Sequence, residues 1–273
     1  MRKKVQRTMY KSHYGFKCLP FSRSIDIKEL YEHPEFKEVK HRLKFAIQNR
    51  LFAVVTGPVG AGKTTALRSI KAEFNDPRYT YIYISQSGIT PRVFYNEILK
   101  ELCLSPIYSK PEARMAVNKA VMKMYSEDQI PVIVVDEAHL LTESMLEEIR
   151  FLINFNMDSM SPLSLILVGQ PELRETLRLK TMEAISQRVS VRFHMDGLTR
   201  EGTEDYILTH LKVAGAEHAI FTDSAVNEIF QFTVGIPRKI NNLCEKCLLD
   251  GFIQEKKLID EIMVKRVIKN EYE

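Results

Sequence analysis

Short apolar runs alternate along the chain with longer segments in which apolar residues recur at every third or fourth position. The runs LFAVVTG (51–57), YTYIYIS (79–85), IPVIVVDEA (130–138), SPLSLILVGQ (161–170) and VSVRFHM (189–195) predict strands. The segments that predict helices are 31–50, 62–74, 90–104, 114–127, 143–156 and 171–179. Apolar strands that alternate with helices indicate an α/β fold with a mainly parallel sheet covered by helices on both faces.

The strand pattern stops at about Thr199. Beyond it, the segments 200–215, 222–235, 237–255 and 260–272 read as helices separated by Gly, Pro or Asp-Ser. We therefore expect three parts: a basic N-terminal arm at 1–24, an α/β domain at 25–198 and a small all-α domain at 199–273.

Length and composition fit this division, because 273 residues with 45% hydrophobic residues can form one medium domain and a smaller one. No apolar run approaches the roughly 20 residues of a membrane span, and the start lacks an apolar signal core. These features predict a soluble, cytoplasmic protein without a membrane partner. The pair Cys244 and Cys247 has no second pair of ligands nearby, so packing on one helix face is favoured over a zinc site.

The segment GPVGAGKT (57–64) matches the phosphate-loop pattern G-x-x-x-x-G-K-[ST] between a predicted strand and a predicted helix. Its glycines let backbone N–H groups surround the phosphates of ATP at a helix N-terminus. Lys63 would reach the β- and γ-phosphates, and Thr64 would be a ligand of Mg²⁺. The predicted nucleotide-binding residues here are Gly57, Pro58, Val59, Gly60, Ala61, Gly62, Lys63, Thr64 and Thr65.

The run VIVVDEA places two acidic residues at the carboxyl end of a buried strand. Ligands of such sheets bind at this end of the strands. Asp136 would therefore hold the Mg²⁺ with its water shell, and Glu137 would polarise the attacking water. A surface acidic pair is the alternative, but an apolar strand aimed at a phosphate loop disfavours it.

Three further polar positions fit an ATPase. Gln170 follows the next strand, where it would sense the γ-phosphate or orient water. Arg188 or Arg192, beside the last strand, would supply an arginine finger, and we favour Arg188. Arg238, near the start of a helix in the second domain, would report the state of the nucleotide. Gln170 could instead belong to a simple strand-end turn, and Arg188 or Arg192 could be a solvated surface arginine.

Basic residues are concentrated at the N-terminus, where no Asp or Glu occurs up to Ser24. This arm is either a solubilising tail or a contact to a phosphate backbone. The predicted DNA contacts are Arg2, Lys3, Lys4 and Arg7 in the arm and Arg92, Arg114, Lys119 and Lys123 after the second strand. The latter four could equally form a solvated helix face.

The letters D-E-A-H at 136–139 occur in a group of helicases, but the rest of the chain does not fit them. The segment AISQRVSVR lacks the glycines of the corresponding helicase motif, and only a helical bundle follows it. The order of phosphate loop, acidic strand, polar strand end, arginine and helical lid resembles the AAA+ class. In that class the ATP site is shared between neighbouring subunits.

Within that class, MYKSHYGFKCLPFS, GPVGAGKTT, VVDEAHLL, LILVGQPELR and GIPRKINNLC together resemble the ExeA-type ATPases, related to general secretion pathway protein A. The resemblance runs from about Met9 to near the C-terminus. It implies a P-loop AAA+ domain with a helical lid, and it implies that Tyr14, Phe16 and Pro20 border the adenine. Cys18 and Leu19 fill the interior of that motif here.

The ExeA-type group has a secretion branch and a stand-alone branch similar to the transposition ATPases of phage Mu and the IstB-like elements. The chain ends at Glu273 without the membrane and periplasmic parts of the secretion branch. The resemblance therefore implies an ATPase that assembles as a homo-oligomer on duplex DNA and activates or targets a DDE-type transposase. The alternative is a secretion or protein-remodelling ATPase that does not bind DNA.

Overall fold

The computed structural model describes residues 10–22, 25–85 and 88–272, which form two compact units. The α/β unit contains residues 34–58 and 63–195, and the helical unit contains the described residues of 1–33, 59–62 and 196–273. Residues 25–33, which we assigned to the α/β domain, therefore group with the C-terminal helices. The short segment 59–62 does so as well.

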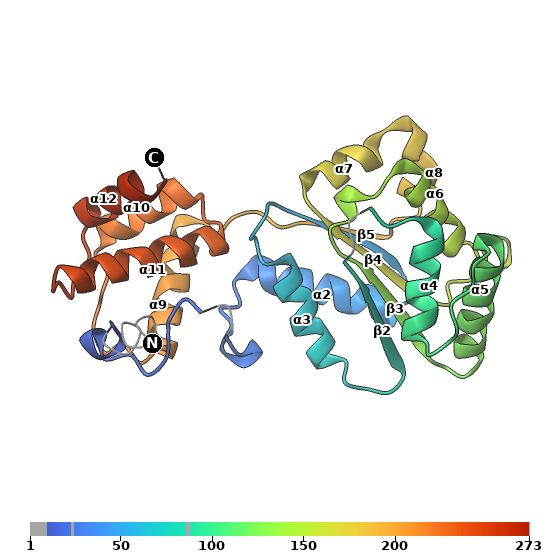
Figure 1. Cartoon of the computed structure of the whole chain (residues 1–273), viewed down its shortest axis with the longest axis horizontal. Helices are drawn as coiled ribbons and strands as arrows, with labels where there is room; N and C mark the ends of the chain where they lie inside the picture. The colour runs from blue at the N-terminus through green and yellow to red at the C-terminus, as the bar shows by residue number, and fades with distance from the viewer. Residues whose placement is uncertain (1–9, 23–24, 86–87, 273) are drawn as a thin grey trace. The chain divides into compact units, whose positions relative to one another are not determined.

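The α/β unit is built on a five-stranded parallel sheet (Figure 1). The strands are β1 (Phe52–Thr56), β2 (Tyr79–Ile84), β3 (Ile130–Val135), β4 (Ser164–Gly169) and β5 (Val191–His194). Their order in the sheet is β2-β3-β4-β1-β5, and β1, β3 and β4 are buried along their whole length. Each predicted strand is confirmed, and burial on both faces explains why the runs of β1, β3 and β4 are continuously apolar.

Helices cover both faces of this sheet (Figure 1). They are α2 (Pro34–Gln48), α3 (Lys63–Glu73), α4 (Pro91–Glu101), α5 (Lys110–Ser126), α6 (Glu143–Leu152), α7 (Pro171–Arg178) and α8 (Glu183–Ser186). Short 3-10 turns lie at Ala138–Leu140, Asn156–Asp158 and Lys180–Met182. In Figure 1, α2 and α3 lie on one face and α4 to α6 on the other. Alternate strand residues, such as Ile133 and Val135 of β3, pack into the larger core cluster on the second face.

Several boundaries of the α/β unit differ from the prediction by three or four residues, and three of them have a local cause. Helix α5 begins at Lys110 instead of Arg114, because Pro111 occupies the first turn, where no backbone N–H is required. Helix α6 ends at Leu152, four residues before the predicted end at Asn156, and a short 3-10 turn follows. Strand β3 ends at Val135, since Glu137 has a left-handed backbone conformation that no strand permits.

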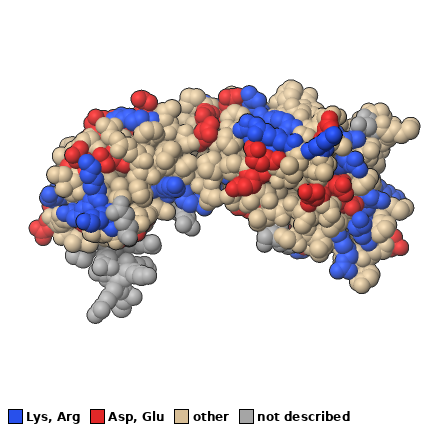
Figure 2. All heavy atoms as spheres, turned by 90° about the horizontal axis from the view of Figure 1, so that it is seen from above, with Lys and Arg blue, Asp and Glu red and all other residues tan. Residues whose placement is uncertain are grey.

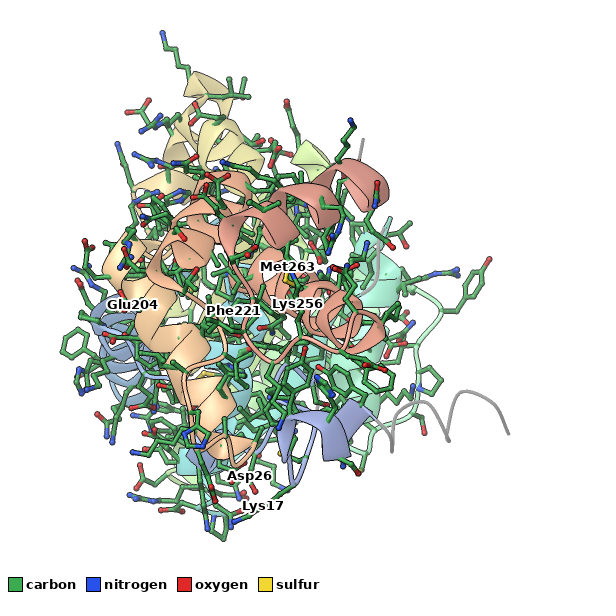
Figure 3. All side chains as sticks on the ribbon, turned by 90° about the vertical axis from the view of Figure 1, so that its left-hand side faces the viewer. Lys17, Asp26, Glu204, Phe221, Lys256 and Met263 are labelled. Carbon is green, nitrogen blue, oxygen red and sulfur yellow. The ribbon has the colours of Figure 1, made fainter. Side chains whose placement is uncertain are left out.

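The helical unit contains α9 (Arg200–Val213), α10 (Asp223–Thr233), α11 (Pro237–Ile253) and α12 (Glu261–Tyr272), preceded by the 3-10 turn η1 (Ile27–Glu29). Thr199 and Thr222 cap α9 and α10 by accepting a backbone N–H with their side chains. Phe221 and Met263 are buried in the core, whereas Lys17 and Asp26 are exposed (Figure 3). The four predicted helices are confirmed.

The N-terminal segment contributes to the core of the helical unit through Tyr10, Phe16 and Phe21. Cys244 and Cys247 are fully buried in the same core as free thiols, so the expected packing of the C-x-x-C pair on one helix face is confirmed. Within the described ranges, none of the helices combines the length and apolar character needed to cross a bilayer.

Candidate ATP site

The phosphate-loop sequence follows β1, the strand at which the order of the sheet reverses. Strand β1 lies between β4 and β5, and the chain passes from it to β2 at the far edge. Ligands of open α/β sheets bind at the carboxyl ends of the strands at such a reversal. At Gly57 a Cβ atom would lie 2.4 Å from the carbonyl oxygen of Met195, so only glycine fits where the chain leaves the sheet. The fold therefore places this sequence where a nucleotide is expected.

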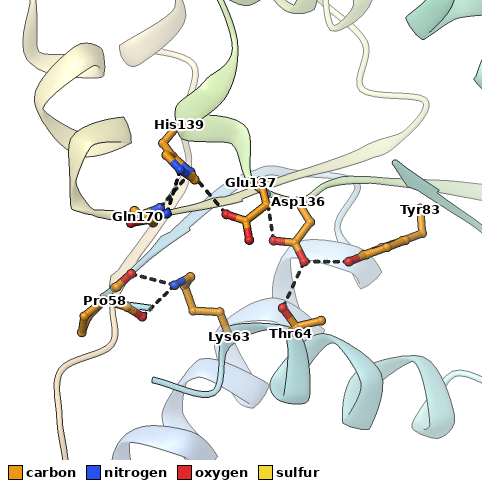
Figure 4. Close-up of polar contacts among 9 residues, drawn as sticks. Pro58, Lys63, Thr64, Tyr83, Asp136, Glu137, His139 and Gln170 are labelled. Atoms are coloured by element: carbon orange, nitrogen blue, oxygen red, sulfur yellow. Dashed lines mark hydrogen bonds and ion pairs between the residues drawn. The ribbon is translucent and has the colours of Figure 1, made fainter. Parts of the chain in front are cut away.

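The conformation of the loop also requires its later glycines. Gly60 and Gly62 have φ angles of +88° and +105°, values that residues with a side chain rarely adopt. Helix α3 begins at Lys63, whose ammonium donates to the carbonyl oxygens of Gly57 at 2.7 Å and Pro58 at 2.9 Å (Figure 4). The Lys63 amine therefore lies beside the start of the phosphate loop, where it could contact the phosphates of a bound nucleotide.

Asp136, the acidic residue directly after β3, is buried and accepts three hydrogen bonds (Figure 4). The Thr64 hydroxyl donates to its Oδ2 atom at 3.0 Å and the Tyr83 hydroxyl to the same atom at 2.7 Å. The backbone N–H of Glu137 donates to Oδ1 at 2.9 Å. The two residues predicted as Mg²⁺ ligands, Thr64 and Asp136, are therefore brought together.

Tyr83 of β2 was not predicted as a site residue. Burial and the hydrogen bond to Asp136 raise the pKa of its phenol well above the ordinary value, so it stays a donor at neutral pH. Strands β2 and β3 are paired in parallel, and Tyr83 lies opposite Val134. The sequence does show a tyrosine near the end of β2, the strand that pairs with β3. The alternating aromatic pattern of β2, however, predicted only a strand and no site residue.

Glu137 follows Asp136 with a φ angle of +53°, and its side chain is about half exposed at 53%. Its carboxylate lies 3.5 Å from Nδ1 of His139, while the Nε2 atoms of His139 and Gln170 are 2.8 Å apart (Figure 4). Gln170 is the N-cap residue of α7 and directly follows β4. Both predicted catalytic residues therefore lie at the carboxyl edge of the sheet, with His139 between them.

The residues at this edge fit ATP with Mg²⁺. Magnesium prefers oxygen ligands and keeps part of its water shell, and here a hydroxyl and a buried carboxylate already meet at 3.0 Å. The lysine amine and the glycine-dependent backbone supply donors suited to phosphate. This combination of donors matches a magnesium–nucleotide complex better than a bare metal site.

The two arginine-finger candidates differ in their contacts. The Arg192 guanidinium, on β5, donates to both the carbonyl and the hydroxyl oxygen of Ser186. Arg188 lies in the loop between α8 and β5 and is partly buried, and its backbone N–H donates to the carbonyl oxygen of Ile185 at 3.1 Å. The assignment of Arg188 stays a prediction, while Arg192 ties β5 to the end of α8.

The predicted nucleotide residues of the helical unit also have defined surroundings. The backbone N–H of Arg238, in the first turn of α11, donates to the carbonyl oxygen of Gly60 at 3.3 Å. The Tyr14 hydroxyl donates to the carbonyl oxygen of Leu248, and the ring of Phe16 lies in the core. The carbonyl oxygen of Pro20 lies 2.7 Å from Nδ1 of His210. Their roles toward adenine or phosphate stay predictions.

The predicted DNA contacts fall into two groups. Arg2, Lys3, Lys4 and Arg7 lie outside the described residues. Arg92 is on α4, and Arg114, Lys119 and Lys123 are on α5. Arg114 is partly buried beside Glu148, whereas Lys119 and Lys123 are exposed.

Comparison with known proteins agrees with this geometry. Residues 46–177 match the model of a family described as an AAA domain. The chain is 32% identical over 250 residues to general secretion pathway protein A of Aeromonas hydrophila, across 89% of this chain but 45% of that protein. The chain thus spans about half the length of this relative.

Two solved structures show the same fold at low sequence identity. The Drosophila ORC bound to DNA has a TM-score of 0.68 and 17% identity, across 95% of this chain and 65% of that chain. Cdc6p from Pyrobaculum aerophilum has a TM-score of 0.68 and 18% identity, across 92% and 70%. The expected P-loop AAA+ fold with a helical C-terminal region is confirmed, and the chain contains an AAA domain and is similar in sequence to part of general secretion pathway protein A.

Proposed function

We propose that this AAA ATPase, a homologue of general secretion pathway protein A, uses ATP to assemble on duplex DNA and there activates or targets a DDE-type transposase. The observation that carries the nucleotide part is the meeting of Thr64 and Asp136 next to Lys63 and Glu137. The DNA part is supported by the surface of α4 to α6 and by a DNA-bound structure of the same fold, and the transposase part by the resemblance to the stand-alone ExeA-type branch.

The residues of the α/β unit divide the work of hydrolysis. Lys63 holds the β- and γ-phosphates, and Thr64 and Asp136 hold Mg²⁺, which neutralises phosphate charge when bound. Glu137 accepts a proton from the attacking water, which its exposed carboxylate can reach. Gln170 orients that water or the γ-phosphate. General-base catalysis of this kind contributes roughly 100-fold to 10,000-fold in rate.

Oligomer formation follows from the shared site of the AAA+ class that this chain resembles. Arg188 of a neighbouring subunit would stabilise the charge that develops on the transferred phosphate, a contribution on the order of 10³-fold to 10⁵-fold in comparable enzymes. ATP then joins subunits in a ring or filament around DNA, and hydrolysis releases them. Under this proposal, ATP hydrolysis sets the lifetime of the DNA complex.

A surface of α4, α5 and α6 supports contact with nucleic acid. The Arg92 guanidinium lies 4.8 Å from the ring centroid of Tyr108, whose side chain is 88% exposed. Arg114 and Arg150 lie 5.4 and 5.0 Å from the ring centroid of Phe151. Guanidinium groups beside exposed rings suit phosphate contacts combined with stacking.

The charge on one face of the protein is mixed. On the face shown in Figure 2, Lys and Arg side chains are interspersed with Asp and Glu. A broad basic surface would favour tight, sequence-independent binding by a monomer. The mixed pattern instead favours binding in which several subunits add their modest contacts. Drosophila ORC, which has the same fold, was solved bound to DNA. This supports duplex DNA as the proposed partner of the present chain.

The test measures binding of the full chain to duplex DNA with ATP, with ADP and without nucleotide, across a salt series, with imaging of the products. We expect oligomers on DNA that require ATP and weaken with salt. Glu137→Gln should bind ATP, lose at least about 100-fold in hydrolysis and prolong the DNA complex. Glu147→Gln, an exposed carboxylate on α6, is the matched control. Absence of DNA binding in every nucleotide state contradicts the proposal.

A second candidate function is a switch for protein remodelling or secretion without DNA. It is favoured by the 32% identity to general secretion pathway protein A. Under this reading the Glu137→Gln variant traps a protein partner instead of DNA. ATP-dependent oligomers that ignore DNA but stably bind a protein partner would select it.

A further inference from the structure

The imidazole of His139 lies between the side chains of Gln170 and Glu137, the two groups that the proposed hydrolysis uses to orient and to activate water. Its side chain is only 10% exposed. One ring nitrogen, Nε2, is 2.8 Å from the side-chain nitrogen of Gln170, and the other, Nδ1, is 3.5 Å from the Glu137 carboxylate. Figure 4 shows these three side chains in a row, with His139 in the middle.

A neutral imidazole fixes which group donates and which accepts in this row of three side chains. A neutral ring has one N–H donor and one accepting nitrogen. If the Gln170 amide donates to Nε2, then Nδ1 carries the proton and points it toward Glu137. The backbone N–H of Gln170 also lies 3.4 Å from Nδ1, but this longer contact would need Nδ1 to accept. The 2.8 Å contact is the shorter one, and we assign the tautomer from it.

The backbone holds the row in place from both ends. Glu137 adopts a left-handed conformation, and the 3-10 turn Ala138–Leu140 that follows brings His139 back over the carboxyl edge of β4. There a Cβ atom on Gly169 would lie 3.0 Å from the backbone nitrogen of His139. The close approach of β4 to this turn thus depends on glycine at the last position of the strand.

We infer that His139 is a positioning residue that connects the γ-phosphate sensor Gln170 to the water-activating carboxylate of Glu137. A glutamine amide has two hydrogens. One is given to His139, and the other can be given to phosphate. The orientation that Gln170 adopts toward phosphate therefore sets the orientation of the ring, and the ring sets the position of Glu137. This inference rests on the ATP hydrolysis proposed above.

The test uses three substitutions of His139 that separate its two nitrogens. In Asn the amide nitrogen takes the place of Nδ1, so His139→Asn keeps the donor toward Glu137. In Gln the amide oxygen can take the place of Nε2 as the acceptor, so His139→Gln keeps the contact to Gln170 alone. His139→Ala removes both. Leu140→Ala is the control, since Leu140 is on the same turn with a side chain that is 48% exposed.

We expect His139→Ala to lower kcat by about 10-fold to 100-fold with the KM for ATP within about twofold. His139→Asn should recover most of that loss, and His139→Gln should recover little. In a double-mutant cycle, His139→Ala combined with Gln170→Ala should lose little more than the worse single variant, because both break the same chain of contacts.

Two results would overturn the inference. The first is that His139→Ala keeps the wild-type kcat although Glu137→Gln abolishes turnover, since Glu137 would then act without His139. The other is a loss that appears equally in ATP affinity, ADP affinity and melting temperature, without selective recovery by His139→Asn. If the wild-type chain itself fails to hydrolyse ATP with or without DNA, the proposed function fails first, and that failure is distinct from both results.

Discussion

Asp136 and Glu148 are two carboxylates of the α/β unit that are almost equally buried, at 6% and 4% exposure. Each accepts a hydrogen bond from a tyrosine hydroxyl, Tyr83 for Asp136 at 2.7 Å and Tyr95 for Glu148 at 3.0 Å. They differ in the charge of their other donors. This difference separates a carboxylate that can serve a ligand from one that serves the fold.

Glu148 has cations of its own chain. Lys110 donates to it at 3.0 Å and Arg114 at 3.4 Å. Burial raises the pKa of Glu148, but the hydrogen bonds from Lys110 and Tyr95 and the charges of Lys110 and Arg114 outweigh burial and hold this pKa below its ordinary value. The donors to Asp136 are two hydroxyls and an amide, all neutral. Buried charge without such compensation is unfavourable unless a cation binds, which is the condition that Mg²⁺ would satisfy.

The largest expected effect comes from removing the charge of Asp136. Asp136→Asn should lower ATP turnover by about 100-fold to 1,000-fold, because the metal loses its anionic ligand. The free energy of unfolding without ligand should stay the same or rise, since a buried charge whose hydrogen-bond donors are all neutral is removed. Steady-state ATPase assays and chemical denaturation measure the two quantities. A destabilised Asp136→Asn protein would show that this carboxylate serves the fold as Glu148 does.

Removing the cations beside Glu148 should leave its carboxylate with the neutral donor Tyr95. In the double variant Lys110→Met/Arg114→Met the buried carboxylate loses both cations, and we expect a loss of about 3 kcal/mol in unfolding free energy at neutral pH. The pKa of Glu148 should then lie above its unfolded value. The contribution of Glu148 to stability would be more favourable below about pH 4 than at pH 7, because the neutral acid is the form that tolerates burial. Adding Glu148→Gln to the double variant should recover most of the loss, and failure to recover contradicts the comparison.

The contrast between these carboxylates also shows what the sequence predicts and what it does not. The proposed roles of Lys63, Thr64 and Asp136 follow from short patterns, because the phosphate loop and the acidic strand end each carry their context within a few residues. Strands β1, β3 and β4 are predicted because burial on both faces makes them continuously apolar, and β2 is predicted from its aromatic and β-branched residues.

The contacts that cross between elements are not encoded in such local patterns. Tyr83 and Asp136 are 53 positions apart, as are Tyr95 and Glu148. Their contacts depend on the order of strands and on helix packing, which hydrophobic periodicity does not specify. The link from His139 to Gln170 depends in addition on the left-handed conformation of Glu137, which its residue type does not favour.

Glu148→Gln alone should have a smaller effect. The amide can still accept from Tyr95, and the two cations are partly solvated, so we expect a loss of about 1–2 kcal/mol at pH 7. The folded pKa of Glu148 is depressed. Its contribution is therefore complete above the unfolded pKa of about 4.3 and is lost as pH falls through the folded pKa. Denaturation from pH 7 to pH 3 should show wild type and variant converging, and a constant difference would contradict the assigned protonation.

The smallest expected effects come from removing one hydroxyl at each carboxylate. Tyr83→Phe leaves Asp136 with Thr64 and the Glu137 amide, so we expect a loss of about fivefold in apparent Mg²⁺ affinity and little change in stability, in line with about 1 kcal/mol for a hydrogen bond. Tyr95→Phe should instead lower the unfolding free energy by about 1 kcal/mol and leave the Mg²⁺ dependence of turnover unchanged. Magnesium titration of ATPase activity measures the Mg²⁺ affinity of both variants, and denaturation measures their unfolding free energy. If Tyr83→Phe lowers stability and leaves Mg²⁺ affinity unchanged, then Tyr83 stabilises the sheet. That result would contradict a role of Tyr83 in preparing Asp136 for the metal.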